Sequence, residues 1–172
     1  LETERLLLRH WTPADRAAFH AMNADPLVMR HFPKRLTQTE ADEKLARMEA
    51  YQRDHGFTFW AVERKADGEL IGNCGLKPLT VPWPEPTDIE IGWMFRAPFH
   101  GRGYAREAAG ATLAHGLTLA PRVIAMTVPA NRESWGLMVR LGMQRAAHLD
   151  FNHPDLPGSP LERHIIYVKE AA

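Results

Sequence analysis

The chain has 172 residues, of which 45% are hydrophobic and 24% are charged, a composition typical of one globular domain. Lysines plus arginines equal aspartates plus glutamates at 21 each, so the net charge gives no field that would attract nucleic acid or an anionic membrane. The single cysteine, Cys74, excludes an internal disulfide and a metal site of paired cysteines. No apolar run has the length of a membrane span, and we expect one cytoplasmic domain over residues 1–172.

Hydrophobic periodicity along the chain predicts an α/β fold of about seven strands and about four helices. Thr37 with Glu40 forms a capping box that predicts a helix start, and Asp67-Gly68 is a strong hairpin signal. The expected strands are residues 6–9, 57–64, 70–76, 88–95, 122–128, 143–151 and 163–169. The expected helices begin near Thr12, Thr37, Gly103 and Glu133 and end near Asp25, Arg53, Leu117 and Leu141.

The stretch from Ile89 to Leu117 runs from an apolar strand through a glycine loop into an alanine-rich helix. Backbone N–H groups of such a loop and of the first helical turn stay free, and the helix dipole adds positive potential. Gly101 and Gly103 allow the backbone to approach an anion closely. This stretch therefore predicts a phosphate site.

Two common nucleotide motifs are excluded by particular residues. A P-loop requires Gly-Lys-Ser/Thr where this chain has Gly103-Tyr104-Ala105. A dinucleotide loop requires a third glycine, where Arg106 stands, and an acid about 20 residues later, which residues 122–125 do not supply.

A third motif fits these residues. His100-Gly101-Arg102-Gly103-Tyr104-Ala105 resembles the acetyl-CoA pyrophosphate loop of the GNAT N-acetyltransferase superfamily, Q/R-x-x-G-x-G/A, with His100 in place of Gln or Arg. Glu90 to Met94 resembles the strand that precedes this loop in the superfamily. Three further blocks resemble the branch that acetylates ribosomal-protein N-termini, and the resemblance covers nearly the whole chain. These blocks are Thr3 to Asp15, Ile71 to Leu76, and Asn131 to Ser134 followed by Leu141-Gly142-Met143.

The resemblance implies a single GNAT-like domain with a mixed central sheet, whose strands diverge in a V near Phe95 and Val128. Acetyl-CoA would lie in that opening, and the backbone N–H groups from Trp93 to Phe95 would bind the thioester oxygen. The residues that the resemblance places at the co-substrate are Trp93, Met94, Phe95, Arg96, His100, Gly101, Arg102, Gly103, Tyr104, Ala105, Arg106, Asn131 and Ser134.

Glu90 is the candidate catalytic base, because an amine attacks a thioester only when it is unprotonated. It is the lone acid between Ile89 and Phe95 and lies on the face opposite Ile89, Ile91 and Trp93. A carboxylate in a mostly buried strand is costly unless it faces a polar cavity. Glu90 would act directly or through water; the alternative is a structural glutamate paired with a lysine or arginine.

Many members of the superfamily use a tyrosine in the last helix to protonate the departing thiolate, and Met138 stands at that position here. Ser134 is then the candidate donor to sulfur, as in the ribosomal-protein branch. Its alternative role is that of an ordinary first-turn residue bonded to its own backbone. Asn131 is expected to cap this helix and to anchor the pantetheine arm.

The remaining polar residues give weaker indications. No two histidines stand at helical i, i+4 spacing, so we expect no metal site. His153 and His164 are interpreted as surface residues, with a place in the lining of an acceptor pocket as the alternative, and Cys74 as a small strand residue. Trp83, which lies among Pro82, Pro84 and Pro86, either forms a substrate rim or packs locally. Connectors expected to shape the acceptor pocket are Val28–Leu36, Val81–Thr87 and Asn152–Pro160.

The sequence thus predicts direct acetyl transfer from acetyl-CoA to a primary amine, either a protein N-terminal α-amino group or a small-molecule amine. The alternative is a catalytically inactive acyl-CoA-binding or sensory module, which Met138 leaves open. No basic patch with interleaved aromatic residues indicates a nucleic-acid partner. A homodimer is compatible with the resemblance, although no residue pattern predicts one.

Overall fold

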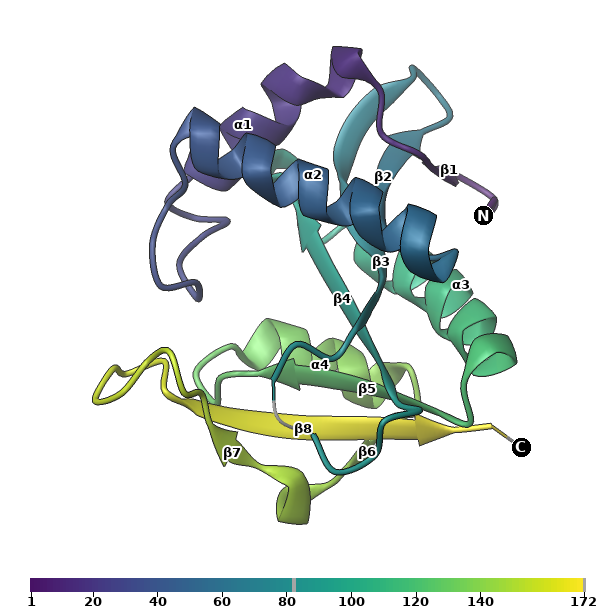
Figure 1. Cartoon of the computed structure of the whole chain (residues 1–172). Coiled ribbons are helices and arrows are strands. Elements are labelled where there is room, and N and C mark those ends of the chain that lie inside the picture. Colours follow the sequence, from purple (N-terminus) through teal and green to yellow (C-terminus); the bar gives the residue numbers. More distant parts are fainter. Residues whose placement is uncertain (82, 172) are drawn as a thin grey trace.

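The chain folds around one mixed sheet in which the strands follow the order β1-β2-β3-β4-β5-β8-β6, with β7 paired to β8 beside this path (Figure 1). A computed structural model describes residues 1–81 and 83–171, so Pro82 and Ala172 lie outside the described residues. β4 and β5 are parallel and the other neighbouring pairs are antiparallel. The strands are β1 Leu6–Arg9, β2 Phe59–Arg64, β3 Glu69–Pro78, β4 Ile89–Phe95, β5 Arg122–Thr127, β6 Gln144–Arg145, β7 Phe151–Asn152 and β8 Arg163–Glu170.

Within the described residues, four α-helices cover the two faces of the sheet in two layers (Figure 1). They are α1 Arg16–Ala24, α2 Gln38–His55, α3 Tyr104–Leu119 and α4 Arg132–Arg140. Buried residues of α1 and α2, such as Phe19 and Met48, form one core with Met94 of β4. Buried residues of α3 and α4, such as Leu113 and Leu137, form the other core on the opposite face. Within the described residues, no helix is both long and apolar enough to cross a membrane.

The helix boundaries follow the capping residues of the sequence. The side chain of Thr37 accepts from the backbone N–H of Glu40 at the start of α2, and Gly56 ends this helix at φ 77°. Thr12 and Asp15 form a second capping box, but it opens a 3-10 turn, Pro13–Asp15, from which α1 continues. The two predicted helix starts are therefore real, with the α-helical part of the first beginning at Arg16.

β4 confirms the predicted division of its side chains between the two faces. Ile89, Ile91 and Phe95 lie in the core beneath α3 and α4. Met94 lies in the core beneath α1 and α2, and Glu90, an even number of residues away, belongs to the same face. The acid of the strand thus points toward the α1–α2 layer.

The single strand predicted over residues 143–151 is wrong. This segment forms β6, a 3-10 turn at Ala147–Leu149, and β7, which gives eight strands among the described residues. The physical reason is Asp150, whose Oδ1 accepts from the backbone N–H of Ile166 at 3.1 Å and whose Oδ2 accepts from Arg145. The carboxylate of Asp150 thus accepts the hydrogen bond that a backbone carbonyl of a paired strand would otherwise accept. Hydrophobic periodicity does not reveal such a substitution.

The two halves of the sheet separate between β4 and β5. These strands pair only at Ile89 with Val123 and at Glu90 with Ile124. Beyond that point β4 stays with β3 as far as Phe95, and β5 stays with β8 as far as Thr127. The predicted V-shaped opening near Phe95 and Val128 is confirmed, and Figure 1 shows the two strands diverging.

Candidate active site

A cavity of about 1240 Å³ occupies the opening between β4 and β5. Its walls come from the connector at 28–33, α2, β3, β4, the glycine loop, the end of β5, α4 and the loop after β7. Pockets for one drug-sized ligand usually measure roughly 300–1,000 Å³, so this cavity has room for two substrates together.

The glycine loop forms the part of the cavity beside α3. Gly101 has φ 72° and Gly103 has φ 81°, a left-handed backbone that glycine adopts without strain. Gly103 immediately precedes Tyr104, the first residue of α3, so the free N–H groups of the first helical turn face the same region as the loop. Gly101, Gly103 and Arg106 line the cavity, which gives this end the properties of an anion site.

Residues of the N-terminal segment hold the glycine loop in place. Arg5 donates from Nε to Glu107 Oε2 at 2.6 Å and from Nη1 to the carbonyl oxygen of Arg102 at 3.1 Å. Its guanidinium also lies 4.6 Å from the ring centre of Tyr104. Burial raises the pKa of Glu107, but hydrogen bonds from Thr3 and Arg5 outweigh it and hold that pKa below its ordinary value. Arg5 therefore connects the loop, α3 and the start of the sheet.

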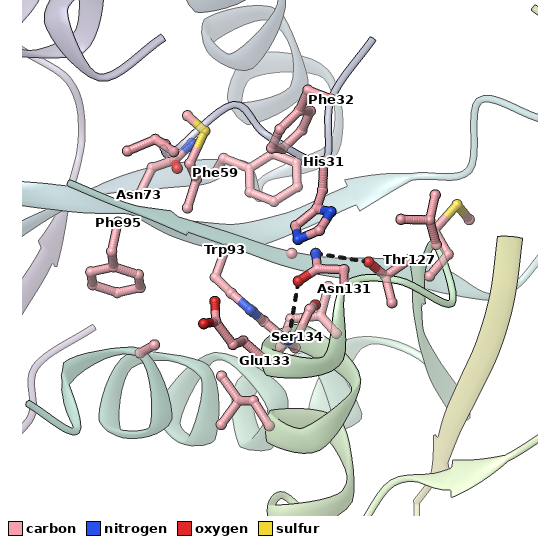
Figure 2. Close-up of a pocket in the computed structure, with 18 of the residues that line it drawn as sticks. His31, Phe32, Phe59, Asn73, Trp93, Phe95, Thr127, Asn131, Glu133 and Ser134 are labelled. Carbon is pink, nitrogen blue, oxygen red and sulfur yellow. Dashed lines mark hydrogen bonds between the residues drawn. The ribbon is translucent and has the colours of Figure 1, made fainter. Parts of the chain in front are cut away.

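Asn131 joins the end of β5 to the start of α4, as Figure 2 shows. Its Nδ2 donates to Thr127 Oγ1 at 3.0 Å, and its Oδ1 accepts from the backbone N–H of Ser134 at 3.4 Å. The predicted cap is thus confirmed. Ser134 is partly exposed and lines the cavity, whereas Met138 is 1% exposed and offers no hydrogen-bond donor there.

Glu90 lies at the last paired position of β4 and β5, with its side chain in the cavity wall. It is 8% exposed, and Lys77 Nζ lies 2.7 Å from its Oε2. Burial raises the pKa of Glu90 above its ordinary value, although the charge of Lys77 acts against this. Lys77 therefore forms an ion pair with this carboxylate. Both interpretations of the sequence are therefore present together: a paired glutamate that also faces a cavity.

Comparison with known proteins identifies the fold around this cavity. The sequence model of the family described as "Acetyltransferase (GNAT) domain" matches residues 5–144. The chain belongs to the GNAT acetyltransferase family. A Bacillus subtilis (strain 168) protein named as an uncharacterized N-acetyltransferase, YnaD, is 33% identical over 84% of this chain and 82% of its own length. YkkB of the same organism is 31% identical over 83% of this chain and 84% of its own length.

Solved structures agree with this family. A GNAT-family acetyltransferase from Bacillus anthracis superposes with a TM-score of 0.81 at 25% identity, covering 99% of this chain and 98% of that one. Two more distant structures share the fold. A Vibrio fischeri ribosomal-protein-S5-alanine acetyltransferase has a TM-score of 0.75 at 18% identity, covering 99% of this chain and 96% of that one. A Vibrio cholerae spermidine N-acetyltransferase has a TM-score of 0.76 at 16% identity, covering 98% of this chain and 97% of that one.

GNAT enzymes use acetyl-CoA, and the residues of this cavity fit it. The two positive-φ glycines leave no side chain between the backbone N–H groups and a pyrophosphate. Beyond Glu90, β4 has no partner on β5, so the backbone edge of its remaining residues is open to the pantetheine arm. Of the co-substrate residues expected from the sequence, those that line the cavity are Trp93, Met94, Phe95, His100, Gly101, Gly103, Tyr104, Ala105, Arg106, Asn131 and Ser134.

Arg96 and Arg102, also expected at the co-substrate, are not among the residues that line the cavity. Arg96 Nη1 donates to Glu69 Oε1 at 2.8 Å and to the carbonyl oxygen of Leu70 at 2.7 Å, which commits its side chain to β3. Arg102 contributes its carbonyl oxygen to Arg5. His100 does line the cavity, but its Nε2 donates to the carbonyl oxygen of Phe95 at 2.8 Å, so this ring nitrogen is occupied by the end of β4.

Some expectations about the acceptor side are wrong. His153 and His164 line the cavity instead of lying apart from it. Of the connector at 81–87, none of the described residues lines the cavity. Trp83 packs locally, donating to Asp88 Oδ2 at 2.7 Å. The connector at Val28–Leu36 does contribute, through five residues from Val28 to Pro33.

Several cavity residues had no signal in the sequence. Asn73 and Lys77 share a face of β3 opposite Met94 and Glu90, and Lys44 projects from α2. Alternation along β3 could have placed Asn73 and Lys77 on one face. It could not have shown that this face opens onto a cavity, because that depends on how α2 and the connector at 28–33 lie over the sheet.

Cys74, by contrast, is a buried strand residue as expected. Burial raises the pKa of its thiol to about 12, so it stays protonated at neutral pH. Its Sγ lies 3.4 Å from Thr112 Oγ1 of α3, within the core. Cys74 therefore has a packing role and is not a nucleophile.

Replacing Arg5 by methionine is expected to raise the KM for acetyl-CoA about 10-fold with little change in the KM for the amine. The reason is that the loop loses one hydrogen bond, one ion pair and the contact with Tyr104. Steady-state kinetics with each substrate varied in turn measures the two constants. Arg53→Met removes an exposed arginine paired only with Asp54 and serves as the matched control. Equal increases in both constants would contradict a role confined to the loop.

Proposed function

We propose that residues 1–172 act as one N-acetyltransferase domain that transfers the acetyl group of acetyl-CoA directly to a primary amine. The observation that supports this best is Glu90, a buried carboxylate at the fork of β4 and β5 that lines the same cavity as the glycine loop. Acetyl-CoA supplies an activated thioester, whose C–S bond breaks as the new C–N bond forms. The amine must lose one proton in this exchange, and the leaving thiolate must gain one.

Glu90 takes the proton from the amine in this proposal, either directly or through water. Its raised pKa favours this role, because a base works best when its pKa approaches the working pH. The open backbone edge of β4 from Trp93 to Phe95 supplies N–H donors for the developing oxyanion. One such donor in an enzyme site contributes about 3–4 kcal/mol to catalysis.

Ser134 donates to the sulfur of the leaving group in the same proposal. Its backbone N–H is held by Asn131, and its side chain lies in the cavity wall, in the helix that also carries Met138. Ser134→Ala is expected to lower kcat about 10-fold while leaving the dissociation constant of acetyl-CoA within about 2-fold. Stopped-flow kinetics and calorimetry measure these quantities. Ser159→Ala, in the loop before β8, is the control, and an unchanged kcat in Ser134→Ala would remove this residue from the mechanism.

The acceptor is either a protein N-terminal α-amino group or a small-molecule amine. Structural relatives named for these two kinds of acceptor share the fold, but their identity to this chain is 18% and 16%. An α-amino group, with a reference pKa of about 7.7–8.0, needs less help from a base than a lysine amine at about 10.4. A single carboxylate such as Glu90 is therefore sufficient for an α-amino group at neutral pH.

A panel of small amines and N-terminal peptides, assayed for release of free CoA thiol, tests the enzyme proposal. We expect amine-dependent release with at least one class. The alternative is a catalytically inactive acyl-CoA-binding module, which Met138 in place of the tyrosine acid favours. Tight binding of acetyl-CoA with no amine-dependent release across the panel would establish that alternative instead.

A further inference from the structure

The charges that line the cavity are unequal. Among the described residues that line it, lysines and arginines number seven, while aspartates and glutamates number three. The cations are Arg30, Lys44, Arg47, Lys77, Arg106, Arg132 and Arg140, and the acids are Glu90, Glu133 and Asp155. Arg106, Arg132 and Arg140 come from α3 and α4, beside the glycine loop. The other four cations, Arg30, Lys44, Arg47 and Lys77, come from the connector at 28–33, α2 and β3, which we call the acceptor side of the cavity. Binding of a pyrophosphate by the glycine loop does not explain them.

Two of the acceptor-side cations, Lys44 and Arg47 of α2, have no anionic partner among the described residues. They are three residues apart, so they are neighbours on one face of the helix. Neither forms a salt bridge with any described residue. The other two acceptor-side cations are already neutralised, because Arg30 is paired with Glu133 and Lys77 with Glu90.

Lys44 is the more constrained of the two. Its Nζ donates to a neutral group, Asn23 Oδ1, at 3.0 Å, and lies 5.8 Å and 5.7 Å from the ring centres of Phe19 and Phe32. Burial, together with the charge of Arg47, lowers the pKa of Lys44 to about 8. A cation in this setting is stabilised when an anion enters the cavity beside it, because a paired buried charge costs far less than an unpaired one.

The sheet side of the same cavity presents buried oxygen acceptors instead of cations. Within the described part of the chain, Asn73 Oδ1 is a buried oxygen that accepts no hydrogen bond, and Glu90 Oε2 has only its ion pair with Lys77. Both residues line the cavity, and both belong to the face of β3 and β4 that points toward α1 and α2. These acceptors are satisfied by a group that carries N–H donors, such as an amine.

We propose that the acceptor is a primary amine that also carries an anionic group, with the amine at Glu90 and the anion at Lys44 and Arg47. This inference rests on the proposed acetyltransferase function and narrows its substrate class to carboxylate- or phosphate-bearing amines. A polyamine would instead place additional cations against Lys44 and Arg47. The anion can belong to a small molecule or to an acidic residue near a peptide N-terminus.

Three small acceptors of similar size test the charge preference: 4-(aminomethyl)benzoate, 4-methylbenzylamine and 1,4-bis(aminomethyl)benzene. We expect kcat/KM for the carboxylate to exceed that for the neutral amine about 10-fold or more, and the diamine to be poorest. Lys44→Met should reduce the carboxylate-to-neutral ratio to near unity, and Lys44→Arg should preserve it. Lys34→Met, at a lysine paired with Glu40 outside the cavity lining, is the control. Preference for the diamine, or a ratio unchanged in Lys44→Met, would overturn the inference.

A peptide pair that differs only by Asp or Asn at the second position identifies the source of the anion. If the Asp peptide is preferred over the Asn peptide and Lys44→Met abolishes this preference, the anion belongs to a peptide. If only 4-(aminomethyl)benzoate is preferred over its neutral counterpart, the anion belongs to a small molecule. Binding of 4-methylbenzoate, followed by ligand-observed NMR, needs no turnover. Binding to the wild type that is lost in Lys44→Met supports the inference even if every amine fails as an acceptor. Equal binding to both proteins, or none to either, refutes it whatever the enzyme assay shows.

Discussion

Replacing Gly103 by glutamate is expected to raise the dissociation constant of acetyl-CoA about 100-fold or more, to the point where turnover is lost. Gly103 has φ 81° and lines the cavity directly before α3. A side chain there would project a negative charge toward the pyrophosphate and would also begin 3.3 Å from Arg5 Nη2, disturbing the residue that holds the loop. Isothermal titration of acetyl-CoA into the purified variant measures the effect.

The matched control for this substitution is Gly68→Glu in the hairpin between β2 and β3. Gly68 has φ 70°, and a Cβ there meets no atom within 4 Å. The variant therefore has the same backbone strain at a position outside the glycine loop. Left-handed backbone costs a non-glycine residue about 1–2 kcal/mol, and thermal melts of both variants should show this loss equally. An affinity for acetyl-CoA in Gly103→Glu equal to that of Gly68→Glu would contradict the assignment of the pyrophosphate loop.

Glu90→Gln is expected to lower kcat about 100-fold to 10,000-fold, while the dissociation constant of acetyl-CoA changes little. Glutamine keeps the size of the side chain but cannot accept the proton of the amine. Asp155→Asn removes another carboxylate of the same cavity, more exposed and outside β4, and serves as the control. A kcat in Glu90→Gln close to that of the control would show that Glu90 is a structural partner of Lys77.

The pH dependence gives an independent test of the same residue. Burial raises the pKa of Glu90, against the charge of Lys77, and catalysis requires its deprotonated form. The activity of the wild type should therefore fall as the pH drops through this raised pKa, which lies above the ordinary 4.5 of a glutamate. In Glu90→Gln the residual activity should lack this step and keep only the dependence that comes from protonation of the amine. A pH–rate profile of kcat/KM for both proteins, with acetyl-CoA saturating, measures the difference.

Much of this fold could be predicted from local patterns. Thr37 and Glu40 form the capping box that opens α2, and Asp67-Gly68 lies in the turn between β2 and β3. These features depend on hydrogen bonds between residues only a few positions apart, so the sequence contains them completely. The strand predicted over residues 143–151 is wrong because its structure depends on a hydrogen bond between distant residues. Asp150 binds Ile166, 16 residues away, and no local pattern records such a bond.

The features of the candidate site also separate into those that local sequence patterns predict and those that depend on tertiary packing. The sequence by itself determined the family, the glycine loop and the position of Glu90 on the face of β4 away from Ile89 and Ile91, because each follows from a motif or from strand alternation. Only the tertiary structure decided that Glu90 is the last residue of β4 paired with β5, that Arg5 holds the loop, and that Lys44 of α2 faces the same cavity. These relations join residues about 35 to 100 positions apart in the chain. Their geometry depends on how the helices pack on the two halves of the sheet, which no single stretch of the sequence specifies.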